Sequence, residues 1–286
     1  VRFQHFLCPV CRAALTPGND GKTYRCPAGH AYDKAHAGYV NLLPPAGHGR
    51  HGDDKLMVRA RTAFLDRGFY DPLARAVADA AVRTASSRDV TLIDAGCGEG
   101  KYTADVINAL TAGGRVTDAV GLDISREAIV AAKRRIPALY AAVAGTSAMP
   151  LPDAGADLLL NIFSPFFGEE FARVLAPGGT LLRVIPTERH LWELKALVYD
   201  VPYPNVLPEA EAPGFTLCAT QDIAYTVTLP THEDIMNLFM MTPYYYKTGI
   251  GDQAKTRDLC ELTVSLGFRL LTYSKNPRSA AGRTAI

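Results

Sequence analysis

Apolar and polar positions change their spacing at about residue 90, and the two parts of the chain predict different structures. From there onward, short apolar runs alternate with segments whose apolar residues recur every three to four positions. The runs predict buried strands and the periodic segments predict helices. Their alternation predicts parallel βαβ units in a doubly wound sheet, so we expect an α/β domain over residues 89–286. The expected strands are VTLID, AVGLDI, LYAAVA, ADLLLNIF and, after a PGG turn, TLLRVI.

The pattern changes again at the end of this domain. ATQDIAYTVTL and LTVSLGFRLLTY are long and rich in strand-forming residues, which predicts an antiparallel pair closing the sheet. THEDIMNLFMM, which lies between them, predicts a helix with Thr231 as its N-cap and acids in its first turn. Before the sheet, residues 46–88 predict a linker followed by connecting helices that break near Gly68.

Residues 1–45 lack this periodicity, and they contain two short cysteine motifs. Cys8 and Cys11 have two residues between them, Cys26 and His30 have three, and 14 residues separate the pairs. Three thiolates and one imidazole match tetrahedral zinc. Four protein ligands leave no open position, so we expect a structural site that helps this module to fold. The competing candidates for the fourth ligand, with less favourable spacing, are His36, His48 and His51.

Cysteine usage also bears on the compartment. Three of the six cysteines crowd the first 26 residues, and the chain has no paired framework of the secreted type. We therefore expect a reducing, cytoplasmic setting. No run of about 18 apolar residues is present, so no membrane span is expected.

Positive charge is concentrated at the front of the chain. Residues 1–75 hold 11 Lys and Arg against 6 Asp and Glu, although the net charge of the whole chain is only +1. This balance fits a polyanion contact near the N-terminus; the alternative is an ordinary solvated surface. The candidate phosphate contacts are Arg50, Lys55, Arg59 and Arg61.

The stretch LIDAGCGEG joins the first strand of the predicted sheet to its helix. Glycines at this place let the backbone approach a ligand closely at the carboxyl edge of the sheet. The GxGxG spacing with a preceding acid differs from the GxGxxG of dinucleotide sites and favours S-adenosylmethionine (SAM). The predicted cofactor contacts in this loop are Asp94, Gly96, Gly98, Glu99 and Gly100, with Glu99 holding the amino group of SAM.

A second acid ends the next strand, in GLDIS. Asp123 is placed to accept hydrogen bonds from both ribose hydroxyls of the cofactor, and Ile124 beside it is a further predicted cofactor contact. The alternative for Asp123 is a capping role at the start of the helix that follows.

The cysteine motifs and the glycine loop together resemble the bacterial RlmA-type 23S rRNA (guanine-N1)-methyltransferases. The similarity covers nearly the whole chain and includes CPVC, CPAGH, DKAHAGYVNLLP, ARTAFLDRGFYDPL, DAGCGEGKYT, GLDISREAI, NIFSP, VLAPGGTLL, PTERHLWELK and MTPYY. The resemblance implies a Rossmann-like class I SAM-dependent methyltransferase with a small N-terminal zinc-binding ribbon domain over residues 1–45. It also implies that Tyr70 and His190 approach the cofactor.

The same resemblance implies a target and partners. The target is a guanine in hairpin 35 of 23S rRNA, of the nucleotide 745 or 748 class, and one subfamily of this group is linked to macrolide resistance. The zinc module is expected to help grip the RNA, and the protein is expected to be a homodimer. Two alternatives stay open: a SAM-dependent methyltransferase acting on a small molecule or protein, and a non-catalytic protein that binds zinc and RNA.

NIFSP follows the fourth predicted strand, where a flipped base would lie. Phe163 is expected to stack on the target guanine, with core packing as the alternative. Asn161 and Ser164 are expected to hydrogen-bond the edge of the base. No residue is singled out as the group that removes the N1 proton, so the catalytic assignment stays open among these three.

Overall fold

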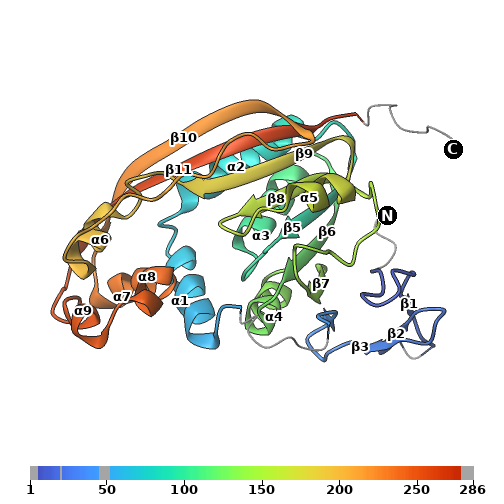
Figure 1. The fold of residues 1–286 in the computed structure, drawn as a ribbon, viewed down its shortest axis with the longest axis horizontal. Helices are drawn as coiled ribbons and strands as arrows, with labels where there is room; N and C mark the ends of the chain where they lie inside the picture. Colours follow the sequence, from blue (N-terminus) through green and yellow to red (C-terminus); the bar gives the residue numbers. More distant parts are fainter. Residues whose placement is uncertain (1–5, 20, 45–51, 278–286) are drawn as a thin grey trace, which may run out of the picture.

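The computed structural model describes residues 6–19, 21–44 and 52–277. Within these ranges, an eight-stranded sheet has the order β10-β11-β9-β8-β5-β6-β7-β4 (Figure 1). Seven of its strands belong to the predicted α/β domain: β5 (Asp89–Ala95), β6 (Val116–Asp123), β7 (Tyr140–Val143), β8 (Ala156–Ile162), β9 (Leu175–Pro186), β10 (Phe215–Leu229) and β11 (Leu262–Lys275).

The strand order confirms the doubly wound α/β fold and indicates where a ligand is expected to bind. β5 pairs in parallel with β6 on one side and β8 on the other, and the chain winds outwards in both directions from there. β11 pairs antiparallel with both β9 and β10, which confirms the predicted closing pair. Ligands of open α/β sheets bind outside the carboxyl ends of the strands at such a reversal point. The ends of β5, β6 and β8 therefore mark the site.

The helices begin and end at residues that the sequence supplies for this purpose. The N-cap of α1 (Lys55–Asp66) is Asp54, whose side chain accepts a hydrogen bond from the Met57 amide. Gly68, with φ of +80°, separates α1 from α2 (Asp71–Thr84). The others are α3 (Lys101–Ala112), α4 (Arg126–Arg135), α5 (Gly168–Val174), α6 (Trp192–Val198), α7 (His232–Met240), α8 (Pro243–Lys247) and α9 (Ile250–Ala254). The predicted cap of α7 is present, since the Thr231 side chain accepts a hydrogen bond from the Asp234 amide.

The predicted PGG turn is not a separate turn. Residues 177–179 lie inside β9, and the ladder between β8 and β9 shifts register at this point. Gly178 has φ of +74°, a conformation that a side chain would strain. The extra residues therefore form an irregularity within the strand rather than a loop before it.

The front of the chain forms a small antiparallel sheet of β1 (Thr16–Pro17), β2 (Thr23–Arg25) and β3 (Ala31–Asp33). The next strand, β4 (Val40–Asn41), pairs in parallel with β7 at the edge of the large sheet. Arg12 adds a second link, because its Nη1 donates to the Met149 carbonyl at 2.9 Å. Figure 1 shows this small module beside β7, away from α6–α9.

Apolar side chains fill both sides of the large sheet. One buried cluster joins Phe64, Leu73 and Val106 on α1–α3 to Leu92 of β5. The other joins Phe171 and Leu181 to the zinc module, through residues such as Leu15. Among the helices in the described ranges, none is both long and apolar enough to cross a membrane.

Candidate active site and metal centre

The glycine loop lies at the carboxyl end of β5 and turns directly into α3. Gly96, Gly98 and Gly100 have φ values of +93°, +54° and +83°, in the left-handed region that favours glycine. A Cβ placed on Gly96 would lie 2.9 Å from Oγ of Ser164, so this residue has no room for a side chain. A Cβ on Gly98 would meet only Nη1 of Arg61, at 3.8 Å. The Gly98 backbone thus faces open space bordered by Arg61, as a loop that receives a ligand requires.

Asp123 ends β6 beside this loop, and both of its carboxylate oxygens accept backbone hydrogen bonds. Oδ2 accepts from the Gly98 amide at 3.0 Å and Oδ1 from the Ser125 amide at 2.8 Å. Ser125 supplies the side-chain cap of α4, accepting from the Ala128 amide, so the capping role considered for Asp123 falls to Ser125. Each oxygen of Asp123 keeps a lone pair for a ribose hydroxyl. Ile124, which follows, is only partly buried.

Two further acids are buried around the loop. Asp94 and Glu99 are 2% and 3% exposed. Oδ2 of Asp94 accepts a hydrogen bond from the Thr103 hydroxyl at 2.6 Å, but its Oδ1 has no partner among the described residues. Burial, with the charges of Asp123 and Glu99 adding to it, raises the pKa of Asp94 to about 7. Burial also raises the pKa values of Glu99 and Asp123.

This concentration of buried acids fits the predicted cofactor. Three carboxyl groups in low dielectric are costly unless a cation compensates them. SAM carries an ammonium and a sulfonium group, and the orphan oxygen of Asp94 shows that the acids are not satisfied by the protein alone. The carboxylate of SAM needs a cation in turn, and Arg61 lies against the loop at Gly98. The charges of the site therefore match the charges of the cofactor.

Tyr70 and His190, predicted from the resemblance, are buried next to each other. The Gly267 amide donates to Nδ1 of His190 at 3.3 Å, so the ring proton lies on Nε2, which is 3.4 Å from the Tyr70 hydroxyl oxygen. Burial, assisted by the charge of Lys195, lowers the pKa of His190 to about 3 and keeps the ring neutral. Nε2–H then donates to Tyr70, which leaves the hydroxyl proton of Tyr70 for another acceptor.

The NIFSP stretch begins inside β8, whose last two residues are Asn161 and Ile162, and continues as a loop beside the glycine loop. Asn161 is 1% exposed, and its amide nitrogen donates to Oγ of Ser164 at 2.6 Å and to the Pro165 carbonyl at 3.1 Å. Oγ of Ser164 donates to the Ala95 carbonyl at 2.6 Å. Both side chains therefore hold the loop in place, and the amide nitrogen of Asn161 is already used within the protein.

Phe163 behaves differently from its neighbours in this loop. It is 44% exposed, and its φ of +54° is rare for a residue with a bulky side chain. Its ring centroid lies 5.7 Å from that of Phe268, which in turn lies 4.7 Å from the His190 ring. Phe163 is thus presented at the mouth of the site rather than packed into the core.

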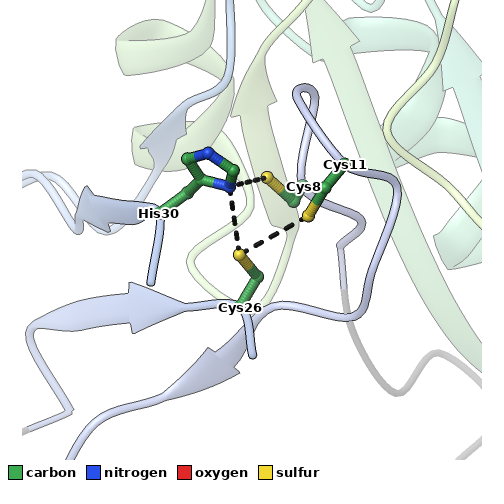
Figure 2. Close-up of side chains that lie close together, drawn as sticks. All are labelled: Cys8, Cys11, Cys26 and His30. Carbon is green, nitrogen blue, oxygen red and sulfur yellow. Dashed lines mark hydrogen bonds between the residues drawn. The ribbon is translucent and has the colours of Figure 1, made fainter. Parts of the chain in front are cut away.

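The four predicted zinc ligands converge at one point of the small module (Figure 2). Their ligand atoms all lie within 4.8 Å of one another. Nδ1 of His30 is 3.5 Å from Sγ of Cys8 and 3.3 Å from Sγ of Cys26, and the Cys11 and Cys26 sulfurs are 3.6 Å apart. Ligands about 2.1–2.3 Å from a tetrahedral zinc lie about 3.5–3.8 Å from one another, so the spacing fits. The cluster found in the described residues contains His30; His48 and His51 lie outside them.

A tyrosine that the sequence analysis did not select supports this centre. The Tyr32 hydroxyl lies 3.4 Å from Sγ of Cys8. Burial opposes the thiolate, but hydrogen bonds from Tyr32 and from the backbone outweigh it and lower the pKa of Cys8 to about 6. Cys8 is therefore prepared to bind metal as a thiolate, and Tyr32 is an outer partner of the site. No spacing rule in the sequence marks Tyr32, since it reaches the sulfur through the pairing of β2 and β3.

The basic residues proposed as phosphate contacts divide into two kinds. Lys55 and Arg59 are exposed, whereas Arg61 is turned into the cofactor site and pairs with Asp53. Arg50 lies outside the described residues. Asp53 was not singled out from the sequence and Arg61 was predicted only as a phosphate contact, because the face that α1 buries depends on its packing against α4 and α7.

Known protein families match both the zinc module and the α/β domain. The family described as "RlmA, N-terminal", a zinc ribbon, matches residues 6–48, and the family described as "Methyltransferase domain" matches residues 92–179. The two matches cover the zinc module and the glycine loop with β6 and β8.

Three relatives match over longer stretches. A protein of Micromonospora griseorubida, provisionally named 23S rRNA (guanine-N(1)-)-methyltransferase, is 42% identical over 66% of this chain and 68% of its own length. A Bacillus subtilis protein with the same provisional name is 32% identical over 85% of this chain and 87% of its own. The 23S rRNA (guanine(748)-N(1))-methyltransferase of Streptomyces fradiae is 39% identical over 67% of this chain and 66% of its own.

The protein uses SAM as cofactor and carries a structural zinc ion in its ribbon. It is a member of the RlmA-type 23S rRNA (guanine-N1)-methyltransferase family.

Proposed function

We propose that this protein transfers the methyl group of SAM to N1 of a guanine in a 23S rRNA hairpin. The observation that carries this proposal is the presence, in one chain, of an RlmA-type zinc ribbon and a SAM-binding α/β domain. Relatives named for this reaction are 42% and 32% identical to this chain over 66% and 85% of its length. A methyltransferase for small molecules needs the glycine loop but has no use for a ribbon with exposed basic residues.

The nucleotide that we propose is guanine 748. Of the three relatives described above, the Streptomyces fradiae enzyme is the one whose name gives a position, and it is 39% identical to this chain. Transcripts of the hairpin with guanine 745 or guanine 748 replaced by adenine test this directly. We expect the change at 748 to abolish labelling from radioactive SAM and the change at 745 to leave it; the reverse result assigns position 745.

The reaction requires guanine N1 to lose its proton before its lone pair attacks. SAM, when bound, supplies a methyl group on a positively charged sulfur. The protein's part is to stack the splayed guanine on Phe163, at the mouth of the site, while Asn161 and Ser164 fix the loop that carries this ring. Neutral His190 holds the Tyr70 hydroxyl so that its proton points to the bound cofactor.

We propose that the zinc module grips the RNA. Lys22, Arg25 and Lys34 are exposed on or next to β2 and β3, where phosphate oxygens can reach them. The RNA affinity should therefore fall steeply as salt is raised, whereas the affinity for SAM should change little. We place this reaction in the cytoplasm, where bacterial ribosomal RNA is made.

We also propose that the protein works as a homodimer, as the family resemblance implies. β10 offers a surface for a second copy, since it is a 15-residue strand at the edge of the sheet and most of its residues are exposed. Sedimentation equilibrium tests this: a mass of about 62 kDa, twice the chain mass of 30.8 kDa, is expected, and a monomer mass contradicts it.

A further inference from the structure

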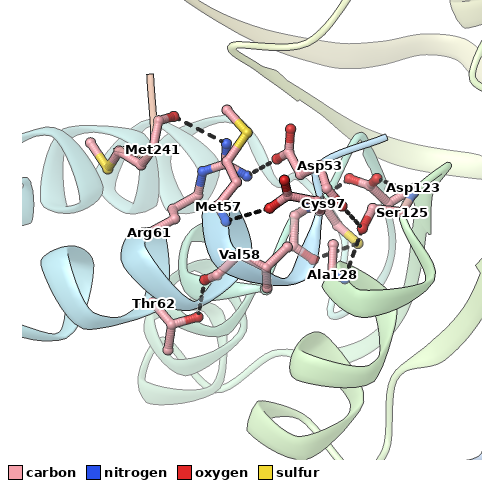
Figure 3. A network of polar contacts seen from close by, with 12 residues as sticks. Asp53, Met57, Val58, Arg61, Thr62, Cys97, Asp123, Ser125, Ala128 and Met241 are labelled. Atoms are coloured by element: carbon pink, nitrogen blue, oxygen red, sulfur yellow. Dashed lines mark hydrogen bonds and ion pairs between the residues drawn. The ribbon is translucent and has the colours of Figure 1, made fainter. Parts of the chain in front are cut away.

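Arg61 is a partly buried cation with acids around it. It extends from α1 towards Asp53 and Asp123 (Figure 3). The charges that act on it come from Asp53, Glu99 and Asp123. These acids hold its pKa above the usual value in spite of burial. Arg61 therefore faces several acids, and Arg135 adds a second positive charge at 3.9 Å from Glu99.

Asp53 forms an ion pair with Nη1 of Arg61, the nitrogen that an incoming carboxylate ligand would contact. Nη1 forms the ion pair with Oδ2 of Asp53, and this same nitrogen lies 3.8 Å from the Cβ position of Gly98. Nη2 donates to the Met241 carbonyl at 3.4 Å, which fixes the plane of the guanidinium from α7. A carboxylate that reached Arg61 over the glycine loop would compete with Asp53 for Nη1.

The backbone around Asp53 is held against the cofactor site as well. Residues 52–54, here called the entry segment, lie directly before α1. The Ser125 hydroxyl donates to the Asp53 carbonyl at 2.6 Å. A Cβ on Gly52 would lie 2.7 Å from the Ser125 amide nitrogen and 2.9 Å from Cγ1 of Ile124. The entry segment thus covers the turn that carries the ribose-binding Asp123.

A second buried polar group points to a ligand at the same place. Among the described residues, the hydroxyl of Tyr102 has no hydrogen-bond partner although it is buried. Tyr102 lies in the first turn of α3, two residues after Gly100 of the glycine loop. A carboxylate bound by Arg61 would give this hydroxyl an acceptor.

We propose that Asp53 is an internal substitute for the carboxylate of SAM. Arg61 pairs with Asp53 in the ligand-free protein and exchanges it for the methionine carboxylate of the cofactor when SAM binds. The exchange releases the Asp53 side chain from the site and loosens the entry segment on the Ile124–Ser125 backbone. This inference rests on SAM as the cofactor and adds an inhibitory contact built into the chain.

Two ligands without the reactive methyl group test the exchange by binding alone. S-adenosylhomocysteine has the amino-acid carboxylate, and 5′-methylthioadenosine lacks the whole amino-acid group. Isothermal titration calorimetry should show that Arg61→Met lowers the affinity for S-adenosylhomocysteine at least about tenfold, a loss of about 1.4 kcal/mol in binding free energy. Asp53→Asn should raise the affinity for S-adenosylhomocysteine severalfold, because the carboxylate that competes for Arg61 is gone. Neither change should alter 5′-methylthioadenosine binding by more than about twofold.

Two further variants control for structural damage. The double variant Asp53→Asn/Arg61→Met leaves no unpaired charge and should bind S-adenosylhomocysteine as weakly as Arg61→Met alone. Arg59→Met, at an exposed position of the same helix, should bind both ligands like the wild type. Equal losses for both ligands in Arg61→Met, or weaker S-adenosylhomocysteine binding in Asp53→Asn, overturn the exchange. A wild-type protein that binds neither ligand contradicts the SAM-dependent function itself.

Discussion

At the scale of single residues, the fold changes the chemistry of side chains that look ordinary in the sequence. Asp94 is a strand-end acid that would be ionised in water. In the protein it is 2% exposed, one of its oxygens lacks a partner among the described residues, and its pKa is raised to about 7. Its ionisation is therefore coupled to the arrival of a positively charged ligand.

The raised pKa predicts a pH dependence of cofactor binding. Below pH 7 the Asp94 carboxyl is protonated and neutral, and a cation that binds beside it must expel the proton. The affinity for SAM should therefore rise by up to about tenfold per pH unit between pH 5.5 and 7, and then level off. Calorimetry should also measure the affinity of Asp94→Asn for SAM at each pH, and we expect this affinity not to change with pH. An affinity of the wild type that does not change with pH would show that ionisation of Asp94 is not coupled to SAM binding.

His190 and Tyr70 predict a loss of activity that exceeds the loss of stability. His190→Ala removes the acceptor of the Gly267 amide and the donor to Tyr70, which costs about 1–3 kcal/mol of folding free energy. The methylation rate should fall by more than about tenfold, since the Tyr70 proton is no longer directed at the cofactor. Tyr70→Phe is the matched variant and should reproduce the rate loss with a smaller loss of melting temperature. Unchanged kinetics in both would make the pair purely structural.

At the scale of elements, the strands of the small module are too short to hold themselves together. β1, β2 and β3 have two or three residues each, so metal binding supplies the folding free energy that a core would otherwise provide. The stability of the module therefore depends on metal binding, whereas that of the large domain depends on its buried apolar core.

This difference predicts separate outcomes for zinc and for cofactor. Cys8→Ala or Cys26→Ala should lower the zinc content from about one ion per chain to almost none and unfold residues 6–44, while S-adenosylhomocysteine still binds. Cys218→Ala, an exposed cysteine on β10, should keep its zinc. Metal analysis beside calorimetry measures both quantities. Full zinc content in the two ligand variants would show that the ligand set is wrong.

Elements were more predictable than the contacts between them. Apolar runs marked β5, β6 and β8, and the Thr231 cap marked α7, because these signals are local. The inward direction of Arg61 was not predictable, since it depends on which face of α1 packs against α4 and α7. The exposure of Phe163 depends in the same way on a left-handed backbone set by the Asn161 and Ser164 contacts.

At the scale of the whole molecule, the zinc module is joined to the catalytic domain rather than tethered to it. β4 extends the large sheet at β7, the Leu7 amide donates to the Pro150 carbonyl at 2.8 Å, and Arg12 donates to two carbonyls near it. The proposed RNA-binding face of the module is therefore held at a fixed position relative to Phe163.

This rigid connection predicts a specific effect of Arg12. Arg12→Met should loosen the module, with faster hydrogen exchange in residues 6–44 and a KM for RNA raised severalfold, because two charge-assisted hydrogen bonds worth about 1.5–3 kcal/mol each are lost. Affinity for S-adenosylhomocysteine should not change. Arg83→Met, on the exposed side of α2, is the control. Unaltered exchange and unaltered KM would show that the module moves independently.

The most direct test of the central claim is methyl transfer from labelled SAM to unmethylated 23S rRNA, mapped by primer extension. A methyl group on guanine N1 blocks pairing, so reverse transcription stops one nucleotide before it. We predict one new stop, one nucleotide before guanine 748, which requires both the protein and SAM. A protein that binds SAM but labels no RNA, or labels it without such a stop, would contradict guanine-N1 methylation of 23S rRNA.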